Sequence, residues 1–364
     1  MRVGIDTVFY SNSPTGIGKY TYELCYHLKK YNELELVLFV NIESPLLSDE
    51  YFKDNEKIIV KYSKNDIRRL WYLGNLVDKS NLDLFHVPSY NIPFIRETKY
   101  IVSIHDLIHI KFSDIYGIPY RIYYETIVKK GLLNAEKIIT ISENSKKDLK
   151  SWLGNYNEDK IYITPLASNK NFSPHLGIID LFYNLNIDKN HFILYVGNNR
   201  PNKNLKRLLI SYSKVLEKNP DFPEMILTCN SNNELDELIE NLFIKDKVFF
   251  IEGITEDELI ILYSYALFLV FPSLYEGFGL PLVEAMSTGC PIMCSRLSSI
   301  PEVVQDNCLY FDPYEIRDIS EALEKMYYDE ELRFKISKQG LERAKDFSWD
   351  KTAYETYKIY NSCI

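Results

Sequence analysis

Short apolar runs alternate with amphipathic stretches along the first half of the chain. The runs rich in strand-forming Val, Ile, Leu, Phe and Tyr fall at 2–6, 34–40, 58–62, 82–87, 100–104, 137–141 and 161–164. Several intervening stretches, such as 19–30, carry apolar residues at the spacing of a helix. Strands that alternate with helices are typical of a parallel sheet covered by helices. The pattern therefore predicts an α/β protein.

The second half repeats this alternation. Strand-like runs fall at 191–197, 225–229, 247–250 and 267–271, and a helix is predicted at 205–216. Two Thr/Ser and Glu pairs, Thr255 with Glu258 and Ser299 with Glu302, have the spacing of a helix capping box. A polar, proline-marked joint at Ser173 and Pro174 separates the halves. We therefore predict one domain at 1–173 and a second at 174–347, as suits a chain of 364 residues.

Charge and cysteine content narrow the function. The net charge is −9, with 23 Lys and Arg against 21 Asp and Glu in residues 1–172, and 19 against 30 in the rest. No concentrated basic face is indicated, which argues against nucleic-acid binding. The six cysteines are scattered without CxxC spacing, so buried free thiols are expected rather than zinc ligands. No signal-peptide pattern and no apolar run near the roughly 20 residues of a membrane span is present, which predicts a cytoplasmic protein.

The most informative stretch is 271–291, FPSLYEGFGLPLVEAMSTGCP. It predicts a strand, a loop and a helix in direct succession. Gly277 and Gly279 allow positive φ and close approach of a ligand to the backbone. Pro281 suits the first helical turn, and Gly289 suits the position after the last turn.

Two carboxylates flank this turn, Glu276 before the glycines and Glu284 inside the helix. A helix N-terminus offers N–H groups to an anion, and ligands bind beyond the carboxyl ends of parallel strands. The stretch therefore predicts a site for an electrophile that carries a phosphate tail. The alternative is structural: Glu284 complements the helix dipole and Glu276 is solvated.

Three other places follow predicted strands. Lys203 lies in a loop after the strand at 191–197, where an ammonium can neutralise a diphosphate. His105 follows the strand at 100–104, whereas His86 and His109 are left unassigned. The first strand leads into a loop through Ser13, Pro14, Gly16 and Gly18, although no complete GxGxxG or GxxxxGK[ST] motif is present.

Together these motifs resemble the retaining glycosyltransferases of family 4. The stretch EGFGLPLVEAM matches that family's Glu, seven residues, Glu motif nearly letter for letter. Weaker matches follow in the family's order: GIGKY, SIHDLIHIKF, LYVGNNRPNKNLKRLL, SSIPEV and YFDP. The resemblance covers most of the chain.

The resemblance implies a fold and a reaction. The fold is GT-B, two Rossmann-like domains facing each other across a cleft, with a final helix at 348–364 that crosses back to the first domain. The reaction moves a hexose from a UDP- or GDP-linked donor to an acceptor hydroxyl, with retention and without metal or cofactor. The absence of a strand-end Asp-x-Asp pair agrees with metal independence.

The resemblance also assigns roles. Glu284 holds ribose hydroxyls, Glu276 and the glycine amides hold the donor sugar, and Lys203 holds phosphate. Many members carry an Arg where this chain has Asn198, so Arg200 is only a candidate replacement. The implied catalytic residues are His105, Glu276 and Lys203. The implied donor-binding residues are Gly16, Gly18, Arg200, Lys203, Glu276, Gly277, Phe278, Gly279, Leu280 and Glu284. Glu302 is predicted to cap a helix, and the alternative is that it contacts the nucleotide.

The acceptor implied is a glycan or a lipid-linked glycan of cell-surface polysaccharide synthesis. Tyrosines with Arg121, Lys129 and Lys130 in 118–134 suit a membrane surface at the inner face, and a plain packed helix is the alternative. A catalytically silent nucleotide-sugar-binding partner is a second hypothesis, against which the intact Glu276 and Glu284 argue. Another GT-B enzyme, such as an epimerase or a phosphorylase, is a third, and no PLP-lysine motif supports a phosphorylase.

Overall fold

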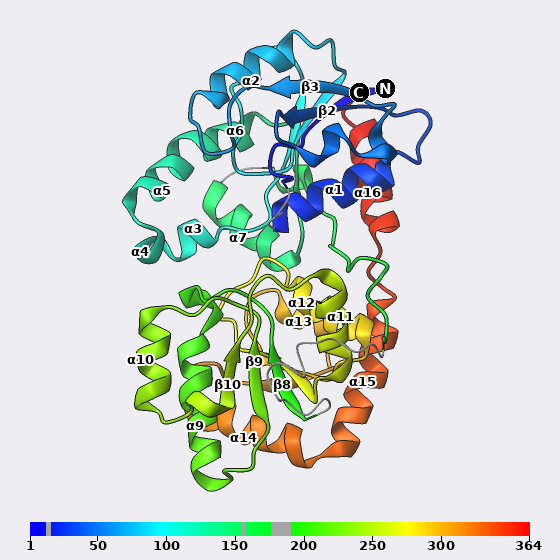
Figure 1. The fold of residues 1–364 in the computed structure, drawn as a ribbon. Helices are drawn as coiled ribbons and strands as arrows, with labels where there is room; N and C mark the ends of the chain where they lie inside the picture. The colour runs from blue at the N-terminus through cyan, green and yellow to red at the C-terminus, as the bar shows by residue number, and fades with distance from the viewer. Residues whose placement is uncertain (12–15, 155–156, 176–190) are drawn as a thin grey trace. The chain divides into compact units, whose positions relative to one another are not determined.

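The computed structural model describes residues 1–11, 16–154, 157–175 and 191–364 (Figure 1). The predicted loop residues Ser13 and Pro14 lie outside these ranges. The chain divides into two compact units. Unit 1 comprises Met1–Leu166 with Ser348–Ile364, and unit 2 comprises Ala167–Phe347.

Unit 1 is built on a parallel sheet of seven strands in the order β3-β2-β1-β4-β5-β6-β7. The strands are β1 Arg2–Asp6, β2 Glu35–Asn41, β3 Glu56–Val60, β4 Leu84–Val87, β5 Tyr100–Ser103, β6 Lys137–Thr140 and β7 Ile161–Ile163. Ile5 at the centre lies opposite Leu38 of β2 and His86 of β4. The inner strands are buried along their length, as continuous apolar runs require.

Helices cover this sheet. They are α1 Gly16–Leu28, α2 Arg69–Asp78, α3 Ile108–Lys111, α4 Ser113–Tyr116, α5 Ile118–Tyr123, α6 Lys129–Asn134, α7 Glu143–Leu153 and α16 Trp349–Asn361. A π-helical turn at Tyr124–Val128 joins α5 to α6. Tyr124, Val128 and Leu132 are buried at four-residue spacing, which favours the packed-helix interpretation of this segment.

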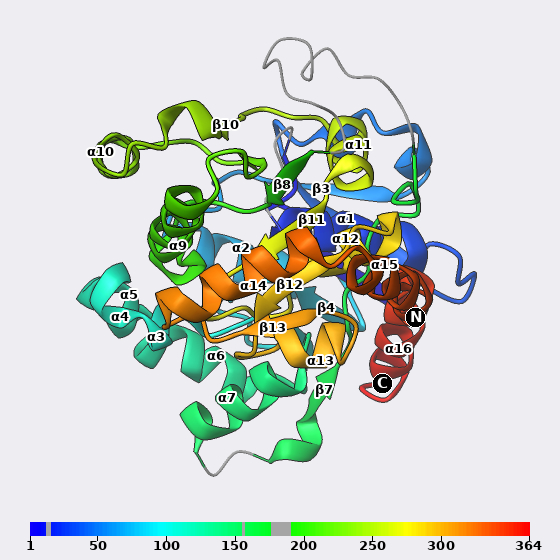
Figure 2. The same cartoon turned by 90° about the horizontal axis from the view of Figure 1, so that it is seen from below.

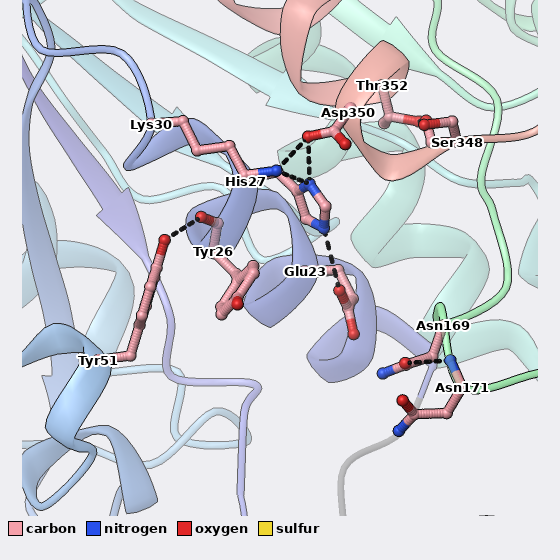
Figure 3. A network of polar contacts seen from close by, with 10 residues as sticks. All are labelled: Glu23, Tyr26, His27, Lys30, Tyr51, Asn169, Asn171, Ser348, Asp350 and Thr352. Carbon is pink, nitrogen blue, oxygen red and sulfur yellow. Dashed lines mark hydrogen bonds and ion pairs between the residues drawn. The ribbon is translucent and has the colours of Figure 1, made fainter.

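The C-terminal helix α16 packs beside α1 in unit 1 (Figure 1). Asp350 in its first turn accepts a hydrogen bond from His27 at 2.8 Å and forms an ion pair with Lys30 (Figure 3). His27 also lies 3.7 Å from the carboxylate of Glu23, one turn earlier. These polar contacts add to the stacking of Tyr31 on Tyr357, whose ring centroids are 4.4 Å apart.

The start of α1 corrects one prediction. We predicted Gly16 and Gly18 in a loop that precedes a helix at Lys19, but the helix begins at Gly16. Gly18, Thr21 and Cys25 are buried at the spacing of one helical face. Burial of that face extends the helix through a residue whose intrinsic preference is against it.

Unit 2 contains a parallel sheet of six strands in the order β10-β9-β8-β11-β12-β13. The strands are β8 Phe192–Tyr195, β9 Glu224–Leu227, β10 Val248–Phe250, β11 Phe268–Phe271, β12 Ile292–Ser295 and β13 Leu309–Phe311. The helices are α9 Leu205–Lys218, α10 Asn233–Asn241, α11 Glu256–Tyr265, α12 Leu280–Thr288, α13 Ile300–Val304, α14 Ile316–Tyr328 and α15 Glu330–Ala344. Figure 2 shows α9 and α14 side by side, and they bury one core with the sheet.

Two local predictions have opposite outcomes. Thr255 and Glu258 form the predicted capping box at the start of α11. Ser299 does not cap α13, because its backbone is already helical and its hydroxyl bonds elsewhere. The six cysteines are free, and all but Cys308 are buried. Among the described helices, none has the length and apolar content to cross a bilayer.

Candidate functional site

The candidate site lies in unit 2, at the carboxyl ends of three neighbouring strands. The sheet order places β8, β11 and β12 side by side. Each leads through a loop into a helix: β8 toward α9, β11 into α12 and β12 into α13. Loops that leave adjacent parallel strands meet at one edge of a sheet, where α/β proteins bind ligands.

The loop after β8 is fixed to the loop after β11 by Asn202. This residue is 3% exposed and sits in a short 3-10 turn, Pro201–Lys203. Its backbone oxygen accepts from the N–H of Leu274 at 2.7 Å, and its Nδ2 donates to the carbonyl of Tyr275 at 3.1 Å. The turn is therefore held against residues 274–275, which positions Lys203 beside Glu276.

Lys203 and Glu276 form an ion pair with Nζ 2.6 Å from Oε1. Both side chains are 13% exposed, so the pair is shielded but reachable. The Lys203 ammonium also lies 5.4 Å from the ring centroid of Phe271. An ammonium has three donors, and Glu276 is its only hydrogen-bond partner in the described part of the chain. The remaining donors give it the capacity to bind a phosphate oxygen.

Two serines after β12 hold the backbone of the loop around Glu276. The N–H of Glu276 donates to Ser298 Oγ at 2.9 Å. Ser299 Oγ lies 2.9 Å from the carbonyl of Glu276 and 3.0 Å from that of Phe278. Sequence reasoning missed this role, since Ser299 was predicted to be a helix cap. Two consecutive serines three and four residues after the end of a buried strand were the available indication.

Glu284 is held from a third element. It is the fifth residue of α12 and is 6% exposed. Tyr263 of α11 donates its hydroxyl to Glu284 Oε2 at 3.0 Å. Burial, reinforced by the Glu284 carboxylate, raises the pKa of Tyr263 well above its ordinary value and keeps it a donor. The helix-dipole alternative for Glu284 is wrong, because the first turn of α12 contains no acidic residue.

The glycines of the motif differ in their requirements. Gly279 precedes α12 with φ of +101°, and a Cβ there would lie 2.9 Å from Leu282 Cδ1. Gly277 does not have a positive φ, so that part of the prediction is wrong. Pro281 lies in the first turn of α12, and Gly289 ends the helix with φ of +74°. The expected strand, loop and helix are present.

The other predicted residues of unit 2 occupy the same edge with different exposure. Phe278 is 5% exposed, with its ring 5.7 Å from that of Phe347. Leu280 begins α12 and is half-buried. Arg200 is exposed, and its guanidinium has no partner among the described residues. It is available to an anion from solvent, and its assignment as a phosphate ligand stays a prediction.

The remaining predicted residues, Gly16, Gly18 and His105, belong to unit 1. His105 follows β5, and its Nε2 lies 3.3 Å from the carbonyl of Pro88. Its ring meets that of Tyr20 edge-on at 4.6 Å. Burial lowers the pKa of His105 to about 4, so the ring is neutral near pH 7. The contact of these three residues with a donor stays a prediction.

The two histidines left unassigned have structural partners. His86 is fully buried on β4, and its ring nitrogens lie 2.7 Å from Tyr360 Oη and 2.7 Å from Ser103 Oγ. Burial lowers the pKa of His86 to about 3. His109 pairs with the hydroxyl of Tyr124 at 2.9 Å. Within the described ranges, no group of three or more His, Cys, Asp or Glu side chains is arranged to hold a metal ion.

Comparison with known proteins agrees with this architecture. The family model for glycosyl transferases group 1 matches residues 180–343, and the model for glycosyltransferase family 4 matches residues 14–167. O-antigen chain mannosyltransferase B of Escherichia coli is 28% identical over 95% of this chain and 96% of its own length. O-antigen chain mannosyltransferase RfbU of Salmonella typhimurium is 24% identical over 86% of this chain and 88% of its own.

Solved structures share the fold over the whole chain. Sucrose-phosphate synthase from Thermosynechococcus elongatus superposes with a TM-score of 0.81 at 18% identity, covering 100% of this chain and 98% of that one. Anabaena Alr3699/HepE in complex with UDP and glucose gives 0.79 at 15% identity and covers both chains completely. The two Rossmann-like units therefore define a GT-B protein. The chain belongs to the group 1 glycosyltransferases of family 4.

Proposed function

We propose that this glycosyltransferase moves a hexose, with mannose as the first candidate, from a UDP- or GDP-linked donor to an acceptor hydroxyl. The acceptor is a glycan or a lipid-linked glycan of cell-surface polysaccharide synthesis. Two relatives that match most of this chain are named O-antigen chain mannosyltransferases, which supports both the sugar and the acceptor class. A structural neighbour that was solved with UDP and glucose supports a nucleotide-sugar donor.

The observation that carries the proposal is the shielded Lys203–Glu276 pair at the start of α12. When the bond between sugar and phosphate breaks, negative charge grows on the departing diphosphate. The Lys203 ammonium and the N-terminus of α12 supply positive potential at that edge of the sheet. Glu276 then keeps its carboxylate for the donor sugar, and Glu284 accepts hydrogen bonds from ribose hydroxyls. This arrangement stabilises the leaving group without a metal ion.

Retention at the anomeric carbon is part of the same proposal. A transition state with positive charge on the sugar ring leaves the departing phosphate close to the acceptor hydroxyl, so the phosphate itself takes the acceptor proton. His105, neutral near pH 7, contributes hydrogen bonds to the donor sugar rather than a positive charge. Gly16 and Gly18, at the N-terminus of α1, lie beside the donor phosphates in this proposal.

Peripheral contact with an anionic membrane is part of the same proposal. Ile118 and Ile122 are 72% and 55% exposed on α5. Arg121 and Lys130 are exposed on the same stretch. Apolar side chains beside basic ones are typical of helices that lie at a membrane surface. Co-sedimentation with anionic and with neutral vesicles tests this contact. If the protein binds neither kind of vesicle, the proposed membrane contact is wrong.

Transfer is tested with UDP- and GDP-hexoses and simple methyl glycosides as acceptors. We expect nucleoside diphosphate release that depends on the acceptor and survives EDTA, and a product whose anomeric configuration matches that of the donor by NMR. Donor binding without transfer to any acceptor would instead favour the silent binding partner. Complete loss of activity in EDTA with recovery in Mn²⁺ would show that the metal-independent part is wrong.

A further inference from the structure

Glu284 has surroundings that are unusual for a charged side chain. It is the only charged residue of α12, LPLVEAMST, and its neighbours at 282–286 are buried. Glu284 itself is 6% exposed. A buried ion is costly unless it is hydrogen-bonded, and an apolar residue would fill the same space at lower cost. The carboxylate therefore needs a partner that compensates its burial and fixes its orientation.

Tyr263 of α11 is such a partner. Its hydroxyl donates to Glu284 Oε2 at 3.0 Å, and the residue is 0% exposed. Burial, reinforced by the nearby carboxylate, raises the pKa of Tyr263 well above its ordinary value, so the hydroxyl keeps its proton. A carboxylate accepts hydrogen bonds at about four lone-pair positions. The bond from Tyr263 therefore orients Glu284 and is compatible with further bonds from ribose hydroxyls.

The position of the Tyr263 hydroxyl is fixed by the structure around it. Tyr263 lies in the last turn of α11, which begins at a complete capping box and packs against α12. Its ring meets that of Phe172 edge-on, with centroids 6.2 Å apart. Two residues after α11 ends, the N–H of Leu267 donates to the carbonyl of Phe192 in β8 at 2.9 Å. The helix that carries Tyr263 is thus tied to both α12 and the sheet.

We propose that Tyr263 is a positioning residue for Glu284, and that the two together select a ribonucleotide over its 2′-deoxy counterpart. The inference rests on the proposed role of Glu284 in binding ribose hydroxyls. Without the hydroxyl of Tyr263, the carboxylate can rotate about its side-chain bonds. Bonds from two neighbouring ribose hydroxyls need both carboxylate oxygens in a defined orientation. A 2′-deoxynucleotide lacks one of these hydroxyls and depends less on that orientation.

Calorimetry with free nucleotides tests this role on the full chain. The probes are UDP and GDP, each compared with its 2′-deoxy analogue, and the measured quantity is the ratio of the two dissociation constants. We expect the wild type to bind the ribonucleotide about tenfold more tightly, or better. Tyr263→Phe should lower this ratio about threefold to tenfold through weaker binding of the ribonucleotide. Affinity for the deoxynucleotide should stay unchanged.

Tyr212→Phe is the matched control. Tyr212 of α9 is another fully buried tyrosine of unit 2, and its hydroxyl donates to the carbonyl of Pro223 at 2.7 Å. Each variant keeps the aromatic ring and removes one buried hydrogen bond, so the two should lower the urea midpoint by similar amounts. Only Tyr263→Phe should change the nucleotide ratio. An equal change in both variants would show a general loosening of unit 2 and overturn the positioning role.

Glu284→Gln separates this inference from the proposed function. It should lower the ratio by itself, and Tyr263→Phe added to it should lower the ratio no further, because the hydroxyl acts through the carboxylate. If Glu284→Gln lowers the ratio and Tyr263→Phe does not, the positioning role is wrong and the ribose assignment stands. If the wild type has no preference for the ribonucleotide, or Glu284→Gln keeps the preference, the ribose assignment is wrong and the inference falls with it.

Discussion

The two units each place an ion pair at the carboxyl edge of their sheet, and the two pairs differ in burial. In unit 1, Arg69 and Asp6 are 1% and 0% exposed. In unit 2, Lys203 and Glu276 are each 13% exposed. A fully buried pair has no solvent to replace a lost partner, whereas a shielded but reachable pair can exchange its partner for a ligand. The pair in unit 1 therefore fixes the position of its two side chains, whereas the pair in unit 2 leaves a positive charge that a ligand can reach.

The side-chain types agree with this difference. Arginine presents a rigid fork that stays charged in a buried site, which suits the enclosed position of Arg69. Lysine carries a compact charge on a flexible stem, so Lys203 can follow a moving phosphate. Four predictions test how the pairs and the units differ.

The largest effect is expected from Arg69→Met. Loss of the guanidinium leaves the Asp6 carboxylate buried without a counter-charge, which costs about 3–5 kcal/mol of the free energy of unfolding. Urea denaturation measures it. Arg68→Met, at the adjacent arginine that is 71% exposed, is the control and should change stability by about 0.5 kcal/mol or less. Equal effects of the two substitutions would show that burial does not distinguish them.

Lys203→Met should act on turnover instead. Its partner Glu276 reaches solvent, so we expect little change in stability. Removal of a charge that stabilises the leaving group should lower kcat by about 100- to 1,000-fold. Lys206→Met removes an exposed lysine three residues away that pairs with Glu234, and it should retain wild-type rates. A Lys203→Met enzyme with near-normal kcat would contradict the role of this ammonium in the reaction.

The sequence predicts those parts of the architecture that are determined by residues close together in the chain. The strand, loop and helix at 268–288 are punctuated by glycine and proline within a few positions, and the structure has them. The apolar runs likewise predict the inner strands, because buried parallel strands need little more than continuous hydrophobicity. Glu276 and Glu284 were found because they flank this local pattern.

The rest depends on contacts between distant residues. Arg69 and Asp6 are 63 positions apart, and Tyr263 reaches Glu284 across 21. No local pattern distinguishes these side chains from ordinary helix and strand residues. For Ser299 a local pattern is present but misleading. Its spacing to a glutamate fits a helix cap, whereas its hydroxyl bonds to the loop at 276–278. In each case, tertiary contacts rather than the neighbouring sequence determine the role of the side chain.

The two glutamates of unit 2 should respond differently to neutralisation. Glu284→Gln should weaken free UDP or GDP by about ten- to a hundredfold, since charge-assisted bonds to ribose hydroxyls contribute about 1.5–3 kcal/mol. Glu276→Gln should leave free-nucleotide affinity nearly unchanged and lower turnover of the complete donor. Calorimetry with free nucleotide and initial rates with donor measure both. If the two variants lose the same nucleotide affinity, the assigned roles are wrong.

The smallest expected effect is a loss of folding stability at acidic pH, which we attribute to a buried histidine of unit 1. His86 of unit 1 is fully buried between Tyr360 and Ser103, and the charge of a protonated His105 would further disfavour its protonation. Burial lowers its folded-state pKa to about 3 from an ordinary value of 6.5. Below pH 6.5 the unfolded chain therefore binds a proton that the folded chain does not. Stability that is present above pH 6.5 is lost as the pH falls toward 3.

At pH 5 this linkage should cost about 2 kcal/mol relative to pH 7. His86→Asn cannot take up that proton, so its free energy of unfolding should fall by about 2 kcal/mol less than that of the wild type over the same interval. Acidic groups present in both proteins cancel in this difference. His191→Asn, at a half-buried histidine of unit 2, controls for the loss of a histidine elsewhere in the chain. Urea denaturation at pH 7, 6 and 5 measures all three proteins, and parallel curves for His86→Asn and wild type would show that the buried imidazole is not the acid-sensitive group.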